Sequence, residues 1–130
     1  MKTLGIGVDI IDNSRIKKSI SNKKFLNRIF SYSEIKFSKK INNKTNYFSK
    51  RFAAKEAFSK ALGTGFRKGL NFNDISIIND RYGKPKIKIN KKLNNIIKNK
   101  FKTHKVNVHL SISDEKKHSI AFVILDKKWI

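Results

Sequence analysis

The sequence predicts an α+β protein, in which a largely antiparallel sheet packs against helices. Apolar residues alternate with period two near both ends of the chain, at residues 3–11 and 106–112, and an alanine-rich helical segment lies between them at residues 51–65. Apolar residues make up 38% of the 130 positions, with ten phenylalanines, which suits a folded chain of ordinary domain size. We therefore expect one domain over residues 1–130.

The charge and composition of the chain limit the kinds of binding partner and the cellular location that we expect. The net charge of +22 predicts attraction to something acidic, such as nucleic acid, an anionic membrane, a phosphorylated small molecule or an acidic protein, without choosing among them. The chain has no cysteine, so disulfides and thiolate metal sites are excluded. Asp9 interrupts the N-terminal apolar stretch too early for a signal peptide, and no apolar run is long enough to span a membrane. We expect a cytoplasmic protein.

Residues 3–11 predict the first strand. The face that we expect in the core consists of Leu4, Ile6, Val8 and Ile10. The opposite face consists of Gly5, Gly7, Asp9 and Ile11. Two glycines before a carboxylate either leave room for a ligand or another backbone to come close, or mark a bulge or crowded contact.

Three helical segments follow. Asp12 or Asn13 can cap a helix that begins near Ser14, and its apolar stripe continues through a break at residues 21–22. Residues 31–34 match a capping box, which predicts a second helix over residues 32–41. The third helix, residues 51–65, ends at Gly63 and Gly65.

The third helix carries one acidic side chain among its cations. Helical spacing places Phe52, Glu56, Lys60 and Gly63 near one face. Glu56 and Lys60 are then one turn apart, which by spacing alone favours an ordinary i,i+4 ion pair worth about 0.2–0.5 kcal/mol.

The C-terminal half predicts two hairpins around a helix. Residues 75–78 and 86–89 form the first, with a turn at 79–83 and Pro85 at a strand start. A helix follows over residues 91–100 with Asn90 as its cap. Strands at 106–112 and 119–125 form the second hairpin.

Few side chains in the sequence are candidates for catalysis or metal binding. Most of the nine acidic side chains lie at caps, turns or strand ends, whereas Asp9 and Glu56 lie inside regular elements without a local role. Two carboxylates that meet near a phosphate would suit Mg²⁺. The glycines match neither phosphate-loop pattern, and the histidines lack zinc-ligand spacing. His109, on the polar side of its strand, either binds a ligand or is an ordinary surface or interface histidine.

Four blocks carry a family resemblance. They are GIGVDIIDNSRI (5–16), RFAAKEAFSKALGTG (51–65), NDRYGKP (79–85) and VHLSISDEKKHSIAFVIL (108–125). In this order the blocks resemble the holo-[acyl-carrier-protein] synthases, the small bacterial 4′-phosphopantetheinyl transferases. The resemblance implies a 4′-phosphopantetheinyl transferase-like fold and transfer of the phosphopantetheine arm of coenzyme A to a serine of apo-acyl carrier protein, in support of fatty acid synthesis. Adenosine 3′,5′-bisphosphate would be released.

The resemblance also implies site residues. Asp9 and Glu56 match the Mg²⁺ ligands, and with Lys60 they form the implied catalytic set. Either Glu56 or a water oriented by Asp9 would accept the serine proton. The residues in blocks that resemble the coenzyme A site are Arg51, Phe52, Gly63, Lys84, Pro85 and His109. The residues that resemble the face for the acidic carrier protein are Arg15, Lys24 and Arg28.

The resemblance further implies a homotrimer with sites shared between subunits, and a partner other than nucleic acid for the positive charge. Where many relatives have Ser-His, this chain has Ser113-Asp114, so residue 114 has no implied role. The rival interpretation is a basic nucleic-acid-binding module, which the charge alone favours. Its weakness is that the aromatic residues lie mostly at apolar helix positions and that the four blocks stay unexplained.

Overall fold

The computed structural model describes residues 2–67, 69–103 and 105–128, and a run of helices separates the first strand from two strand pairs. In chain order they are β1 (Lys2–Asp12), α1 (Asn13–Ser19), α2 (Lys23–Ile29), α3 (Tyr32–Ser38), α4 (Lys44–Leu62), a 3₁₀ turn (Phe72–Asp74), β2 (Ser76–Asn79), β3 (Pro85–Lys88), α5 (Lys91–Phe101), β4 (Val106–Asp114) and β5 (His118–Lys127). Within the described ranges, no helix has the length and apolar character needed to cross a membrane.

The strands form two separate antiparallel sheets. In the larger one β5 lies between β1 and β4, and in the smaller one β2 pairs with β3. The strands at the two ends of the chain thus share one sheet, with Val8 opposite Phe122 and Phe122 opposite Ser111. The predicted combination of helices with antiparallel strands is present, although its strands are divided between two sheets.

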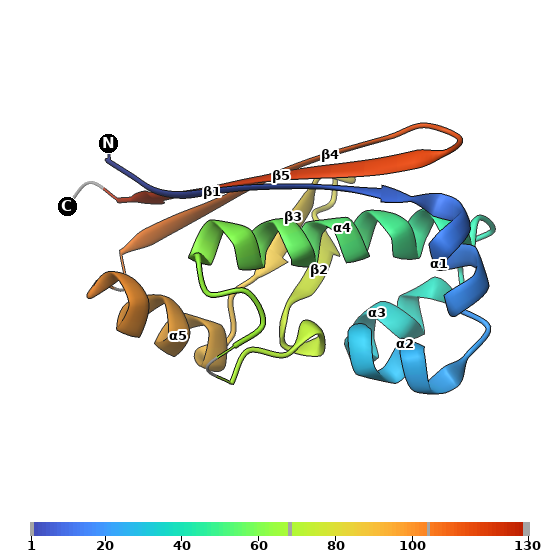
Figure 1. Ribbon diagram of the computed structural model, residues 1–130, viewed down its shortest axis with the longest axis horizontal. Helices are drawn as coiled ribbons and strands as arrows, with labels where there is room; N and C mark the ends of the chain where they lie inside the picture. Colours follow the sequence, from blue (N-terminus) through green and yellow to red (C-terminus); the bar gives the residue numbers. More distant parts are fainter. Residues whose placement is uncertain (1, 68, 104, 129–130) are drawn as a thin grey trace.

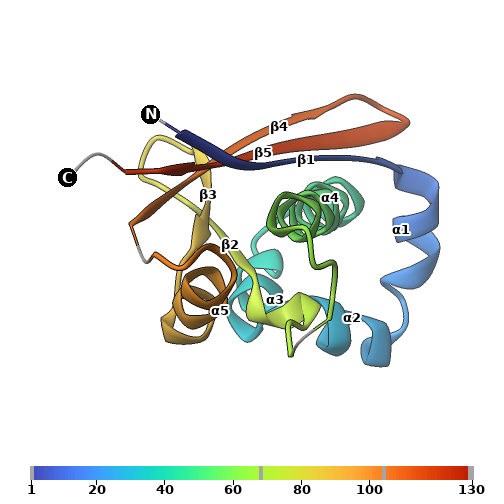
Figure 2. The same ribbon diagram turned by 60° about the vertical axis from the view of Figure 1, so that its left-hand side comes forward.

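Helix α4 lies at the centre of the molecule. It runs along one face of the three-stranded sheet, and α2, α3 and α5 lie on its other side (Figures 1 and 2). Twelve of its residues are buried, among them Ala53, Ala54, Ala57 and Phe58. Neither figure places an element over the opposite face of the sheet.

The predicted core face of β1 is wrong. Ile6, Val8 and Ile10 are 58%, 47% and 62% exposed, whereas Ile11, on the glycine face, is 3% exposed. The glycine face turns inward because α4 approaches it closely: a Cβ added to Gly7 would lie 1.9 Å from the carbonyl oxygen of Ala57. Both possibilities for the glycines are present in part: another backbone comes close in a crowded contact, and a register shift between Thr3 and Gly5 marks a bulge or irregularity.

Most other element predictions are confirmed with shifted ends. Asp12 caps α1, Asn22 caps α2 after the predicted break, and Ser31 with Glu34 forms the capping box of α3, which ends at Ser38. Helix α4 begins at Lys44, earlier than predicted, and ends where Gly63 takes the left-handed conformation at φ 81°. Both predicted hairpins and the capped helix α5 are present.

Candidate functional site

The contact between β1 and α4 brings Asp9, Glu56 and Lys60 together. Asp9 follows Gly7 on the inner face of β1, and Lys60 Nζ donates to Asp9 Oδ1 at 3.2 Å and to the carbonyl oxygen of Val8 at 3.0 Å. Among the described residues, the ion pair of Lys60 is with Asp9 and none joins Lys60 to Glu56. The predicted i,i+4 ion pair is therefore wrong, because the lysine reaches across to the strand instead.

Asp9 and Glu56 lie in an environment that disfavours two negative charges. Partial burial raises the pKa of Asp9 above its ordinary value, against the opposing effect of Lys60. Burial also raises the pKa of Glu56, and the charge of Asp9 raises it further. The two carboxylates are thus close enough to repel each other, and a cation between them would relieve the repulsion.

The donor atoms at this contact fit Mg²⁺. The described residues contain no group of three or more His, Cys, Asp or Glu side chains placed to hold a metal ion. Asp9 and Glu56 would supply two carboxylates and leave the remaining positions open. Mg²⁺ is commonly bound in this way, by one or two carboxylates together with waters and substrate phosphates.

A pocket of about 300 Å³ opens between α3, α4 and the β2–β3 hairpin. Arg51 lies on its wall, with its guanidinium 3.6 Å from the ring centre of Tyr47 and Nη2 donating to Asn79 Oδ1 at 3.1 Å. Arg51 Nε is buried and has no hydrogen-bond partner in the described structure. Pro85 is the register partner of Asn79, so the predicted residues Arg51 and Pro85 border one region.

The remaining predicted coenzyme residues are more dispersed. Phe52 is half-buried, stacked between Phe25 and Phe72, so it packs within the core on this side of α4. Gly63 ends α4, and Lys84 is exposed in the hairpin turn. His109 is exposed on the outer face of the large sheet, opposite the face that carries Asp9.

The predicted carrier-protein residues lie on α1 and α2. Arg15, Lys24 and Arg28 are all exposed. The charge of Arg15 lowers the pKa values of both Asp9 and Glu56, although less than burial raises them, so Arg15 lies near the carboxylates. Asp114, which had no implied role, accepts a hydrogen bond from Asn46 and so ties the β4–β5 turn to the first part of α4.

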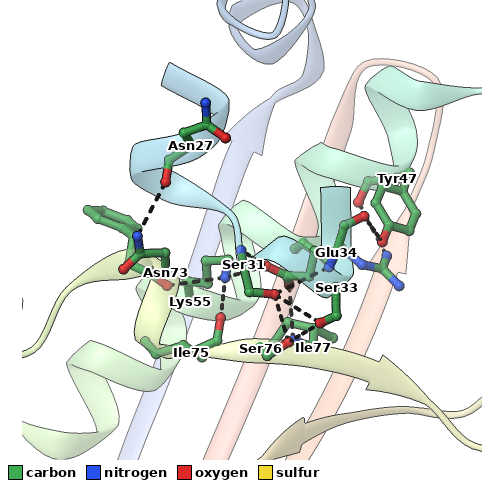
Figure 3. A network of polar contacts seen from close by, with 12 residues as sticks. Asn27, Ser31, Ser33, Glu34, Tyr47, Lys55, Asn73, Ile75, Ser76 and Ile77 are labelled. Carbon is green, nitrogen blue, oxygen red and sulfur yellow. Dashed lines mark hydrogen bonds and ion pairs between the residues drawn. The ribbon is translucent and has the colours of Figure 1, made fainter. Parts of the chain in front are cut away.

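The sequence interpretation missed a buried ion pair behind the site. Lys55 Nζ donates to Glu34 Oε1 at 2.7 Å and to the carbonyl oxygens of Phe72 and Ile75 (Figure 3). Glu34 Oε2 accepts from the backbone of Ile77 at 3.0 Å. The pair joins α3, α4 and β2, and burial lowers the pKa of Lys55. Helical spacing from Phe58 and Leu62, three and seven residues further on, could have placed Lys55 on the buried side.

Comparison with known proteins identifies the class. Residues 5–123 match the family model of the 4′-phosphopantetheinyl transferase superfamily, so the chain belongs to that superfamily. It is 60% identical to the holo-[acyl-carrier-protein] synthase of Pelagibacter ubique over 98% of this chain and 100% of that protein. It is 46% identical to that of Clostridium tetani, with 98% of both chains covered. The predicted resemblance to the holo-[acyl-carrier-protein] synthases is confirmed.

Solved structures confirm the fold. The holo-[acyl-carrier-protein] synthase of Neisseria meningitidis is similar with a TM-score of 0.87 and 36% identity, covering 96% of this chain and 99% of that one. The enzyme of Bacillus anthracis, solved in complex with coenzyme A (3′,5′-ADP), has a TM-score of 0.81 and 37% identity over 98% of this chain and 100% of that one. The predicted α+β class and transferase-like fold are both correct.

Proposed function

We propose that this chain transfers the 4′-phosphopantetheine arm of coenzyme A to a serine of apo-acyl carrier protein. The observation that carries the proposal is the meeting of Asp9, Glu56 and Lys60 where β1 contacts α4. In the reaction the serine oxygen bonds to the phosphorus that bears the pantetheine arm, and the bond from that phosphorus to the bridging oxygen breaks. Adenosine 3′,5′-bisphosphate leaves, and the holo-carrier protein supports fatty acid synthesis.

Asp9 and Glu56 would hold Mg²⁺ at the pyrophosphate. The metal ion would supply positive charge to neutralise the pyrophosphate and the departing phosphate. Lys60 supplies further positive charge, since its half-exposed ammonium is held beside Asp9 and stays accessible to a phosphate oxygen. The serine proton would pass to Glu56 or to a water oriented by Asp9. Burial and the charge of Asp9 raise the pKa of Glu56 in the metal-free chain, but a carboxylate that binds Mg²⁺ loses basicity, so the raised pKa does not choose between the two acceptors.

The pocket beside Arg51 suits the nucleotide end of coenzyme A. Its lining is mostly apolar, with Tyr47 and Ile77 among its residues, and Arg51 adds a cation at the wall. Lys84 and Pro85, in the neighbouring hairpin, complete this side of the proposed site. The other proposed coenzyme contacts are Phe52, Gly63 and His109, of which Phe52 has the weakest support because it stacks inside the core.

The exposed faces of α1 and α2 suit an acidic carrier protein. Arg15, Lys24 and Arg28 present cations there, and Arg15 lies near the carboxylates. A carrier protein bound on this surface would bring its serine towards Asp9 and Glu56. Electrostatic complementarity of this kind speeds association and orients the partner.

A homotrimer accounts for the uncovered face of the sheet. Five exposed apolar side chains gather on β1 and β5: Ile6, Val8, Ile10, Ile120 and Phe122. The strands pair Val8 with Phe122 and Ile10 with Ile120, so these side chains are neighbours on one surface. An apolar patch of this kind is typical of a subunit interface. Light scattering should give three times the chain mass of 15.1 kDa, whereas the monomer mass at micromolar concentration would refute assembly.

The proposed transferase activity is tested by measuring the mass of the carrier protein. Purified protein with coenzyme A, Mg²⁺ and cognate apo-carrier protein should add the mass of the phosphopantetheine arm to the carrier. Chelation should stop the reaction and Mg²⁺ should restore it. Glu56→Gln should remove turnover while the far-ultraviolet spectrum stays native. A folded wild-type sample that adds no mass would refute the proposal. The predicted cytoplasmic location stays a prediction.

A further inference from the structure

His109 and Asp126 form a closely bonded pair on the outer face of the large sheet. His109 Nε2 lies 2.6 Å from Asp126 Oδ2. The histidine side chain is 56% exposed, whereas that of the aspartate is 1% exposed. The second oxygen of Asp126 accepts from Asn107 Nδ2 at 2.9 Å. A buried carboxylate is thus held by two side chains of β4.

The ionisation of Asp126 decides which ring nitrogen of His109 is available to bind a ligand. The hydrogen bond from Asn107, with the contact to His109, holds the pKa of Asp126 below its ordinary value. An ionised carboxylate only accepts, so Nε2 carries the proton and donates it to Asp126. Among the described residues, no hydrogen bond engages Nδ1. The ring is therefore oriented at one nitrogen and open at the other.

A second histidine–carboxylate pair shows that this arrangement is not a general feature of surface histidines in this chain. His118 and Glu115 lie 3.1 Å apart in the β4–β5 turn, but both side chains are largely exposed. Burial of a carboxylate is costly unless its oxygens are bonded. Asp126 is buried with both oxygens used, so it can hold the ring of His109 in one orientation.

We infer that Asp126 is a positioning residue that directs Nδ1 of His109 to a phosphate oxygen of coenzyme A. The inference rests on the proposed function, in which His109 is a coenzyme contact. A protonated imidazole donates from both nitrogens, so a ring whose Nε2 is bonded to Asp126 can donate from Nδ1 to the phosphate, and Asp126 holds the ring in the orientation for this contact. Asp126 also removes rotamer freedom from the ring before the coenzyme binds, which lowers the entropic cost of the contact.

His109 and Asp9 lie on opposite faces of the large sheet, which decides the coenzyme site that His109 can reach. Asp9 is on the face of β1 that contacts α4, whereas His109 is on the outer face of the same sheet. The sheet separates them within one chain. His109 would therefore contact a coenzyme held where a second copy in the proposed homotrimer meets the outer face.

A double-mutant cycle on His109 and Asp126 tests the inference. The variants are His109→Ala, Asp126→Asn and the combination, with calorimetric affinity for adenosine 3′,5′-bisphosphate and steady-state kinetics as readouts. Asp126→Asn should weaken binding about tenfold, as expected for loss of a hydrogen bond to a charged group, and raise KM for coenzyme A more than it lowers kcat. In the His109→Ala background, the same change should have no further effect. Glu115→Gln is the matched control and should leave affinity unchanged.

Three outcomes would overturn the inference. One is an unchanged affinity in Asp126→Asn while His109→Ala binds weakly. Another is an equal loss from Asp126→Asn in both backgrounds, because a merely structural role would act without the histidine. The third is a normal affinity in His109→Ala, which would also remove His109 from the coenzyme site. Transfer of mass by the wild-type protein would show in each case that the proposed function stands.

Discussion

Substitution of Gly7 by alanine should separate β1 from α4, the two elements that carry the carboxylates Asp9 and Glu56 proposed to bind the metal ion. The added Cβ would lie 1.9 Å from the carbonyl oxygen of Ala57 and 2.7 Å from the backbone nitrogen of Ala61. Both atoms belong to the backbone of α4, so no side chain can rotate away. Carbon–oxygen contacts normally lie at about 3.3–3.6 Å, so the helix must retreat from β1 by roughly 1.5 Å.

The displacement of α4 also determines how much stability and activity Gly7→Ala should lose. Overpacking of a well-filled core costs typically about 1–3 kcal/mol, which leaves most domains folded at 25 °C. Glu56 moves with Ala57, whereas Asp9 stays on the strand with Gly7. A misplacement of about 1 Å can cost roughly 100-fold in rate. We therefore expect Gly7→Ala to fold and to transfer the arm about 100-fold more slowly.

The assay compares initial rates of mass transfer with thermal unfolding. Ala57→Gly is the matched control, because it lowers helix stability by about 1 kcal/mol at the same contact without pushing α4 away. Near-normal activity in Gly7→Ala would show that the close approach does not set the geometry of the site. An equal loss of activity in Ala57→Gly would attribute the effect to lower stability rather than to separation.

Three further predictions follow from the buried ion pair, the carboxylates and the basic surface. Lys55→Met leaves Glu34 buried without its cation and should cost about 3–5 kcal/mol, measured by urea unfolding; a loss below 1 kcal/mol would contradict this. The raised pKa values of Asp9 and Glu56 mean that the folded, metal-free chain binds protons more tightly than the unfolded chain. The stability that these two groups contribute is therefore complete below their ordinary pKa values of 3.8 and 4.5, and it is lost as the pH rises through their raised pKa values. The affinity for Mg²⁺ rises over the same pH range, because the metal ion binds the ionised carboxylates. Unfolding and Mg²⁺ titrations against pH check both trends, and the Asp9→Asn/Glu56→Gln double variant should lose them. Arg28→Glu should raise KM for the carrier protein at low salt while leaving KM for coenzyme A unchanged, and the difference should shrink at high salt.

The sequence was most informative where a local rule decides the structure. The capping residues Asp12, Ser31 and Asn90 each begin a helix as their positions indicated, because a cap is a contact between near neighbours in the chain. The predicted break at residues 21–22 is also present, and there Asn22 caps α2. The family blocks likewise singled out Asp9, whose contact with Lys60 spans most of the first half of the chain. Such a contact has no signature in local spacing.

The buried polar groups escaped prediction for a related reason. Glu34 was assigned to a capping box, which it does form, but its second oxygen and its bond to Lys55 depend on elements more than 20 residues away. Asp126 lies one residue beyond the predicted strand 119–125, whereas in the structure it belongs to β5 and β4 supplies it with two partners. An ionisable side chain directly after an apolar run, as Asp126 is after Leu125, is the signal that could have prompted a search for partners.

The error in β1 has the widest physical consequence. The alternation was correct, but its apolar side is exposed and its glycine side faces α4, because helix approach requires the absence of Cβ atoms and not the presence of apolar bulk. An apolar strand face that is exposed in one chain can still be core in an assembly. If so, part of the apolar stabilisation of this protein is gained between copies, and its midpoint of thermal unfolding must rise with protein concentration. A midpoint that is independent of concentration would mean that Val8 and Phe122 remain in water.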